Sequence, residues 1–322
     1  MKKNILFYAC IIVLIFTGCK KDTDQIRVLL DWTPNSNHTG LYIALEKGWF
    51  AQEGLKVTIT QPPEDEALVL LASGKAEFAV SFQESMGPAI AKERDALPVI
   101  AVAAIISHNT SGIMSLAKSG IKRPADLAGK KFASWETPLV TAVVRRIVEK
   151  DGGDFNTVRM IPNFATDAFS ALQTDVDAVW IYYAFDGIPA EVKNIEINYI
   201  DLGSYDSILD FYTPVLAVNT NWAAANPQTV KKFLEAVSRG YNFAANNPVE
   251  AAEILLKHVP ETDREIVIRS QEYLKTRYRD DAKRWGEIDP VRWGRFYKWM
   301  YEQRLLEKDI GEGGFTNEYL PL

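Results

Sequence analysis

The sequence is poor in cysteine, histidine and runs of basic residues. Its 322 residues include two cysteines, Cys10 and Cys19, and three histidines. Since both cysteines fall near the start, the rest of the chain can form no internal disulfide and hold no thiolate metal site. The formal net charge is −6 and no run of Lys or Arg occurs, which disfavours nucleic acid as a partner. The phosphate-binding pattern GxxxxGK[ST] is absent too, so any ATP hydrolysis must lie in a partner protein.

The first 25 residues have the pattern of a targeting segment. Two lysines precede an apolar stretch at 5–16, which is too short to span a membrane comfortably. The stretch ends in Phe-Thr-Gly-Cys, similar to a bacterial lipoprotein cleavage box. We therefore expect residues 1–18 to be a signal peptide, Cys19 to be lipidated and residues 19–25 to be a tether. The alternative is an ordinary signal peptide with a chance cysteine.

Beyond the tether, the chain alternates between strand and helix patterns. Predicted strands cover residues 26–30, 57–60, 78–82, 99–106, 131–134, 158–162, 178–182 and 214–219. Predicted helices cover residues 41–47, 66–73, 84–92, 138–150, 166–172, 229–245, 248–257, 263–273 and 289–306. The last of these helices carries apolar residues at helical spacing, which predicts core packing. The alternation by itself indicates the α/β class.

A polar loop at 31–40 joins the first predicted strand to the first predicted helix. In an open α/β sheet such a loop lies at the carboxyl end of a strand, where ligands bind. The first-turn N–H groups of the helix point into the same space. Trp32, Asn35, Asn37 and His38 there offer a stacking face and polar hydrogen-bonding groups. The structural alternative makes Asn35 a turn former, Asn37 an N-cap and Trp32 a core residue.

The ends of the other predicted strands carry aromatic, amide and acidic residues. The wider set comprises Gln83, Glu84, His108, Asn109, Ser111, Trp135, Glu136, Trp180, Tyr182, Tyr183, Phe185, Asp186, Tyr212 and Thr213. The residues that we expect to bind a ligand are Trp32, Asn35, Asn37, His38, Glu84, Asn109, Trp135, Glu136, Trp180, Tyr183, Asp186 and Tyr212. We expect no metal site, cofactor or catalytic residue. Structural alternatives exist for single members: Glu84 and Glu136 suit a first helical turn, and Asp186 suits a turn.

The wider set contains no Lys or Arg, which bears on the class of ligand. A sulfonate, nitrate or phosphate ester normally draws a basic side chain into its site. A planar aminopyrimidine instead needs stacking faces and acceptors for its exocyclic amine. The composition of the set therefore favours a neutral or cationic aromatic ligand.

Several segments resemble the thiamine-precursor-binding members of the NMT1/THI5-like substrate-binding proteins. They are LDWTPNSNHTGLYIALEKGWF with EGLKV, then SGKAEFAVSFQE, HNTSGIMS, VDAVWIYYAFDG, DFYTPVLAVN, NPVEAAEILL and RWGEID. The resemblance covers essentially the whole chain after the tether, although NPVEAAEILL is a generic helix of many binding proteins.

The resemblance implies a periplasmic-binding-protein type II fold, with two α/β lobes joined by two crossover strands around a ligand cleft. Residues 26–112 plus 215–322 would form one lobe and residues 113–214 the other. It implies a monomeric lipoprotein on the extracytoplasmic side of the membrane. That protein would deliver a hydroxymethylpyrimidine-type thiamine precursor, such as formylaminopyrimidine, to an ABC permease and its ATPase subunit.

Two other functions remain open. The same transport role could serve a flavin precursor or another aromatic compound. The eukaryotic members of the superfamily are pyrimidine synthases that use a Cys-rich iron motif with an active-site His and Lys. The absence of any cysteine after Cys19, together with the export signal, argues against the enzyme.

Overall fold

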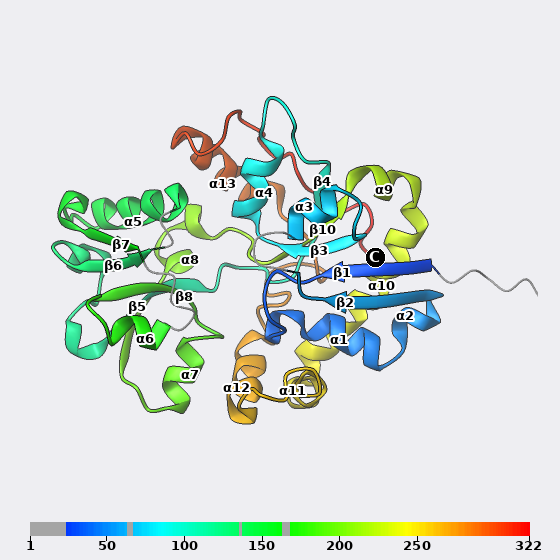
Figure 1. Cartoon of the computed structure of the whole chain (residues 1–322), viewed down its shortest axis with the longest axis horizontal. Coiled ribbons are helices and arrows are strands. Elements are labelled where there is room, and N and C mark those ends of the chain that lie inside the picture. Colours follow the sequence, from blue (N-terminus) through cyan, green and yellow to red (C-terminus); the bar gives the residue numbers. More distant parts are fainter. Residues whose placement is uncertain (1–23, 63–66, 135–136, 163–167) are drawn as a thin grey trace, which may run out of the picture.

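The computed structural model describes residues 24–62, 67–134, 137–162 and 168–322, which form two α/β lobes lying side by side (Figure 1). The first lobe is built on a five-stranded sheet in the order β2-β1-β3-β10-β4. Its strands are β1 (Asp24–Leu29), β2 (Leu55–Thr60), β3 (Phe78–Ser81), β4 (Val99–Ala104) and β10 (Val215–Asn219). Strand β1 pairs parallel with β2 and β3, while β10 pairs antiparallel with β3 and β4.

The second lobe repeats this plan with the order β7-β6-β8-β5-β9. Its strands are β5 (Ser111–Leu116), β6 (Lys131–Ser134), β7 (Arg159–Pro162), β8 (Ala178–Tyr182) and β9 (Ile197–Asp201). Strand β6 pairs parallel with β7 and β8, and β5 pairs antiparallel with β8 and β9. In both lobes, therefore, one strand runs against its parallel neighbours.

Helices cover both faces of each sheet. Around the first sheet lie α1 (Thr39–Glu46), α2 (Trp49–Gln52), α3 (Ala67–Ala72), α4 (Gln83–Ile90), α9 (Thr220–Ala225), α10 (Pro227–Asn246) and α11 (Pro248–Leu256). Around the second lie α5 (Pro138–Lys150), α6 (Ala168–Leu172), α7 (Gly187–Val192) and α8 (Leu202–Tyr205). Single turns of 3₁₀ helix occur at η1 (Ser36–His38), η2 (Ala117–Ser119), η3 (Pro124–Leu127), η4 (Phe155–Thr157) and η5 (Ser207–Leu209).

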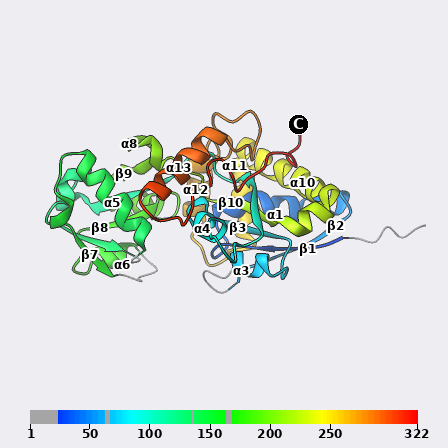
Figure 2. The same ribbon diagram turned by 90° about the horizontal axis from the view of Figure 1, so that it is seen from above.

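The chain crosses between the sheets at residues 105–110 and again at 210–214. The two crossovers are joined directly, because the N–H of Ile105 donates to the carbonyl of Pro214 at 3.0 Å. The last two helices, α12 (Arg264–Leu274) and α13 (Pro290–Glu302), lie near this junction (Figures 1 and 2). The ring of Phe296 in α13 stacks on Phe211 of the second crossover at 4.1 Å. The C-terminal helices therefore brace the region where the lobes meet.

The strand and helix predictions agree with the structure in most places. Helix 138–150 and strand 178–182 match α5 and β8 to the residue. The C-terminal aromatic residues predicted as core are buried, including Trp293 and Tyr297. The predicted helix 289–306 was too long, since α13 ends at Glu302.

The predicted strands and helices omit β5, α7, β9 and α8 of the second lobe, and the first three illustrate why. Strand β5 begins with Ser and Gly, which are typical of a loop. Strand β9 is a short edge strand containing Asn and Asp, and α7 carries Pro189 within its first turn. Each element exists because neighbouring elements hold it, and its local sequence gives a weak signal.

Within the described residues, no helix has both the length and the apolar character needed to cross a bilayer. Residues 1–23 fall outside this description, and with them the predicted signal peptide, Cys19 and most of the tether.

Candidate ligand site

The loop after β1 is closed by a capping box. The side-chain oxygen of Asn35 accepts a hydrogen bond from the N–H of Asn37 at 2.9 Å, and Nδ1 of His38 accepts one from the N–H of Asn35 at 3.1 Å. Because Nδ1 is an acceptor, the ring proton lies on Nε2, which donates to Oδ1 of Asp31 at 2.6 Å. The structural alternative in which Asn37 is the N-cap is wrong, since Asn35 caps η1 and His38 occupies the N-cap position of α1. His38 thereby fixes the position of the Asp31 carboxylate.

Two tyrosines hold the loop from behind. The hydroxyl of Tyr241, in α10, donates to the carbonyl of Asn37 at 2.6 Å. The hydroxyl of Tyr278 donates to the carbonyl of Ser36 at 2.7 Å. Both hydroxyls and the carbonyls that they bind are buried, so these hydrogen bonds are shielded from competing water. The loop backbone is therefore anchored to the core of the first lobe.

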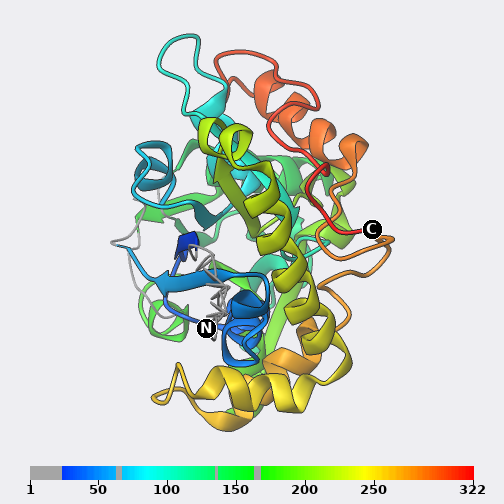
Figure 3. The same cartoon turned by 90° about the vertical axis from the view of Figure 1, so that its right-hand side faces the viewer.

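A close crossing of α1 and α10 brings Tyr241 to this position. Figure 3 shows α10, in yellow-green, beside the blue α1. A Cβ atom built on Gly240 would lie 2.0 Å from the carbonyl oxygen of Gly40, and one on Gly40 would lie 2.3 Å from the Tyr241 ring. Only glycine allows the backbones to approach so closely.

Trp32 stands at the front of the same loop. Its side chain is 41% exposed, so the alternative that placed it in the core is wrong. The ring leaves a large flat face available for stacking.

Glu84 lies in the first turn of α4, at the carboxyl end of β3. Its Oε1 accepts a hydrogen bond from the hydroxyl of Thr213, at 3.4 Å, and its buried Oε2 has no partner among the described residues. The hydroxyl of Tyr182, at the end of β8, lies 3.4 Å from that of Thr213. Since the Thr213 proton points to Glu84, Tyr182 donates to Thr213. A hydrogen-bonded chain thus runs from the second lobe to the first.

Burial dominates the electrostatics of this centre. Burial, helped by the negative charge of Asp31 and opposed by the lowering effect of the hydrogen bonds, raises the pKa of Glu84 to about 8. Burial and the charge of Glu84 raise the pKa of Tyr182. No Lys or Arg is among the main causes of the pKa shifts of Glu84 and Tyr182. The centre is therefore acidic and keeps a proton at neutral pH.

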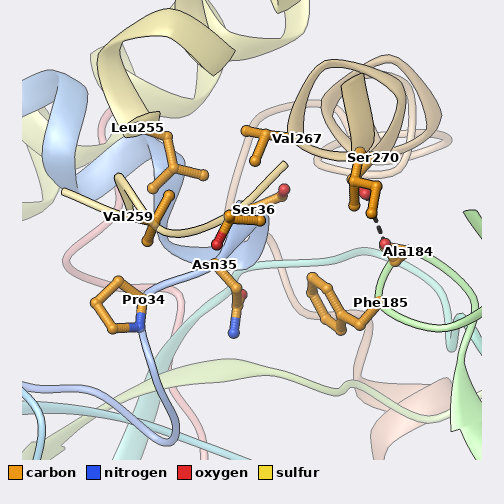
Figure 4. A pocket seen from close by; sticks show the side chains of 11 residues that line it. Pro34, Asn35, Ser36, Ala184, Phe185, Leu255, Val259, Val267 and Ser270 are labelled. Carbon is orange, nitrogen blue, oxygen red and sulfur yellow. Dashed lines mark hydrogen bonds between the residues drawn. The ribbon is translucent and has the colours of Figure 1, made fainter. Parts of the chain in front are cut away.

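A small cavity of about 120 Å³ adjoins the loop at Pro34, Asn35 and Ser36 (Figure 4). Asn35 and Phe185 lie at its wall, so it is lined from both lobes, and the remainder comes from α11, α12 and the segment between them. The hydroxyl of Ser270 donates to the carbonyl of Ala184 at 2.6 Å beside it. This bond fixes the loop after β8 against α12.

Several of the predicted ligand residues hold the structure together. The Asn109 side chain donates to the carbonyl of Leu209 at 2.7 Å and accepts from the N–H of Ser111 at 2.8 Å. Tyr212 is buried, and its hydroxyl accepts a hydrogen bond from the N–H of Asp289 at 2.8 Å. Both side chains have their polar groups occupied near the crossovers.

The aromatic run at residues 180–185, at the end of β8 and just after it, is divided between different surroundings. Trp180 lies in the core of the second lobe, where its indole N–H has no partner among the described residues. Tyr183 packs against Tyr199 and Tyr273 and donates its hydroxyl to Glu191. Asp186 is half-buried at the start of α7.

Trp135 and Glu136 lie outside the described residues. The binding role of the predicted set as a whole stays a prediction. The structure adds Asp31, which the sequence-based set omitted, although its position directly after a strand could have indicated it. The fold also brings together Tyr182 and Thr213, which were in the wider set only. No three His, Cys, Asp or Glu side chains in the described part of the chain are grouped as a metal ion would need.

Two lobes with matching five-stranded sheets, joined by two crossovers and with polar side chains converging between them, define the periplasmic-binding-protein fold. The structure is similar to the alkanesulfonate-binding protein of Xanthomonas axonopodis pv. citri bound to MOPS. The TM-score is 0.69, the identity is 15%, and 91% of this chain and 98% of that one are covered. The chain belongs to the NMT1/THI5 like family, whose model matches residues 35–251.

Two relatives cover most of the chain. It is 27% identical to the formylaminopyrimidine-binding protein of Halalkalibacterium halodurans, over 98% of this chain and 99% of that protein. It is 25% identical to the 4-amino-5-hydroxymethyl-2-methylpyrimidine phosphate synthase of Aspergillus parasiticus, over 92% and 88% of the two chains. The names of both relatives refer to an aminopyrimidine.

Proposed function

We propose that the protein binds an aminopyrimidine precursor of thiamine, of the formylaminopyrimidine or hydroxymethylpyrimidine type, between its lobes. The observation that carries this proposal is the buried acidic centre of Asp31 and Glu84, together with the exposed ring of Trp32, which follows Asp31 in the chain. An aromatic ligand that bears an amino group meets both features, by stacking and by donating hydrogen bonds. The relative named as a formylaminopyrimidine-binding protein supports the same ligand class.

The acidic centre also argues against an anion. A sulfonate or nitrate would stand beside Asp31 and Glu84 without a Lys or Arg among the main electrostatic influences on Glu84. Removing such a charge from water without a cationic partner is costly. The likeness to the alkanesulfonate-binding protein therefore concerns the fold.

In the cell, the protein would be the extracytoplasmic solute-binding component of an ABC importer. A monomer anchored through lipidated Cys19 would present its closed, loaded form to the permease, and an ATPase subunit would supply the energy. Residues 26–112 plus 215–322 and residues 113–214 would move as the two lobes, with closure around the ligand as the signal.

Two alternatives have specific support. The aromatic rings of Trp32 and Phe185 would also suit a riboflavin-type ligand or another flat compound. The synthase relatives raise enzymatic pyrimidine synthesis. However, the sequence after Cys19 contains no cysteine for a Cys-rich iron motif, and we propose no catalytic activity.

A ligand panel tests the proposal. The full chain, purified in detergent, is heated with formylaminopyrimidine, hydroxymethylpyrimidine, riboflavin, taurine or nitrate. We expect the aminopyrimidines to raise the melting temperature and the anions to leave it unchanged. A preference for taurine would overturn the proposal, a preference for riboflavin would favour the first alternative, and stoichiometric iron in the purified protein would favour the second.

The anchor has its own test. Cys19→Ala should move the protein from the membrane fraction to the soluble fraction. A variant that stays with membranes after high-salt and carbonate washes would contradict lipidation.

A further inference from the structure

We propose that the site binds its aminopyrimidine together with one shared proton, held between the Glu84 carboxyl and the ring nitrogen next to the amino group. The inference rests on the proposed function and adds how that site recognises the ring. It makes Glu84 a specificity-determining residue whose protonation is matched to that of the ligand.

The first observation is the geometry of the Glu84 carboxyl. Its Oε1 accepts one hydrogen bond, from Thr213 at 3.4 Å, and retains a second lone pair. Its Oε2 is buried and has no partner among the described residues. A buried polar atom without a partner is costly, so such an atom at the place where the two lobes meet indicates a group that arrives with a ligand. Each of the two carboxyl oxygens can therefore form one further hydrogen bond.

The second observation is the set of groups around this carboxyl. They are Asp31 at the end of β1, which is held by His38, Tyr182 at the end of β8, and Tyr297 of α13. Burial raises the pKa of both tyrosines, so they remain protonated. Burial and the charge of Asp31 raise the pKa of Glu84 to about 8, so its carboxyl keeps its proton at neutral pH.

A protonated carboxyl presents an O–H donor beside a C=O acceptor. The edge of a 4-aminopyrimidine presents a ring-nitrogen acceptor beside an amino N–H donor, so the two edges form a pair of parallel hydrogen bonds. Moving the proton from oxygen to the ring nitrogen gives a carboxylate and a pyrimidinium with the same two bonds. The two hydrogen bonds thus need one proton, which either the Glu84 carboxyl or the pyrimidine ring can supply.

Other proton counts break the pair. With no proton, the carboxylate faces the ring-nitrogen lone pair. With two protons, the O–H of the acid faces the N–H of the pyrimidinium. The affinity should therefore be highest between the pKa of the free ring and the pKa of Glu84, and should fall about tenfold per pH unit on either side, by proton linkage. At high pH the site must take up a proton on binding, and at low pH it must release one.

Calorimetry on the full chain in detergent tests this with 4-amino-5-hydroxymethyl-2-methylpyrimidine as the probe, from pH 5 to pH 9.5. Each pH is measured in two buffers of different ionisation enthalpy, which gives the number of protons exchanged. We expect no exchange near pH 7 and an uptake that approaches one proton above pH 8. Affinity that is independent of pH from 7 to 9.5 would overturn the shared proton and leave the proposed function intact.

Glu84→Gln provides the decisive variant, because the amide keeps a donor and an acceptor but cannot ionise. We expect about tenfold weaker binding at pH 7, because a charge-assisted pair becomes neutral, and no further loss above pH 8. Glu265→Gln is the control, since Glu265 is an exposed glutamate in the first turn of α12. It should keep the wild-type profile.

Each outcome separates the two proposals. Should Glu84→Gln retain the loss at high pH, another group holds the proton and this inference fails. Should the wild type bind no aminopyrimidine at any pH, the proposed function fails with it. The proton count of the wild type decides the question even if the variant does not fold.

Discussion

The loop of 31–38 in the first lobe and the strip of 180–186 in the second carry the candidate site in different ways. The loop is fixed inside its own lobe, by its capping box and by two tyrosine hydroxyls. The strip depends on contacts that reach outside its lobe: Tyr182 donates to Thr213 in the crossover, and the Ala184 carbonyl accepts from Ser270 of α12. The first half of the site is therefore preorganised, whereas the second has contacts at Tyr182 and Ala184 that depend on the relative position of the lobes.

This difference indicates that the two halves of the site have different roles. A ligand that stacks on Trp32 meets a surface that needs little ordering, which reduces the entropic cost of binding. The contacts of Tyr182 and Ala184 are complete only when the lobes are together, so they can report that the ligand is present. Most of the predictions below test one half of the candidate site at a time.

The largest effect is expected from Gly240→Ala, which disrupts the α1–α10 crossing that supports the loop of the first lobe. The new Cβ would lie 2.0 Å from the carbonyl oxygen of Gly40, so α1 and α10 must separate. We expect the free energy of unfolding to fall by about 3 kcal/mol or more, as in severe overpacking, measured by urea denaturation.

Gly294→Ala is the matched control, because it is also a helical glycine. Its Cβ would approach the flexible side chain of Glu312, at 3.1 Å, and would lie at an ordinary contact distance of 3.4 Å from the backbone of Gly311. Alanine favours a helix over glycine, so stability should stay the same or rise slightly. Equal losses in both variants would contradict a special role for the α1–α10 crossing.

Trp32→Ala removes the stacking face and leaves the support of the loop intact. Because Trp32 is 41% exposed, the melting temperature should hardly change. Affinity for the aminopyrimidine should fall at least tenfold, from lost ring stacking together with lost apolar contact.

The control for that experiment is Tyr301→Ala, which removes an exposed aromatic ring, 44% exposed, from α13. It should bind like the wild type. Unchanged calorimetric affinity in Trp32→Ala would show that the ligand does not stack on this loop.

Charge in the site can be assigned to one lobe by amide variants. Glu84→Gln tests the first lobe, and Glu136→Gln and Asp186→Asn test the second. One of the three should bind an aminopyrimidine about tenfold more weakly or worse, since a charge-assisted hydrogen bond is lost. None should gain affinity for taurine or nitrate. Normal binding by all three variants would remove the carboxylates from the site.

The sequence predicted those parts of the fold whose causes are local. Helix α5 begins at Pro138 after a Thr cap, and β8 is a β-branched and aromatic run, so their bounds were readable. The hydrogen bonds that hold the site could not be predicted, because their partners are distant in the sequence. Tyr241 binds Asn37 across 204 positions, and Thr213 binds Glu84 across 129. Residue type identified Asn109 and Tyr212 as candidates, but only the fold shows that their polar groups are occupied.

The smallest effect concerns the crossovers between the two halves. Nδ1 of His108 lies 2.7 Å from Asp210 of the second crossover, and its Nε2 lies 3.1 Å from Asp281. The hydrogen bond to Asp210 raises the pKa of His108, so the protonated ring stabilises the folded state. This contribution is complete below the unfolded pKa of about 6.5 and disappears as the pH rises through the higher folded value.

His108→Gln should therefore be less stable than the wild type at pH 5.5, and the difference should shrink at pH 8.5. Because the ring is 30% exposed, we expect a change in that difference of less than about 1 kcal/mol, measured from urea midpoints at both values. Asp210→Asn should remove the same pH dependence, since Asp210 is the main cause of the raised pKa. A difference between wild type and His108→Gln that is equal at the two pH values would show that the crossovers are held together without a titrating histidine.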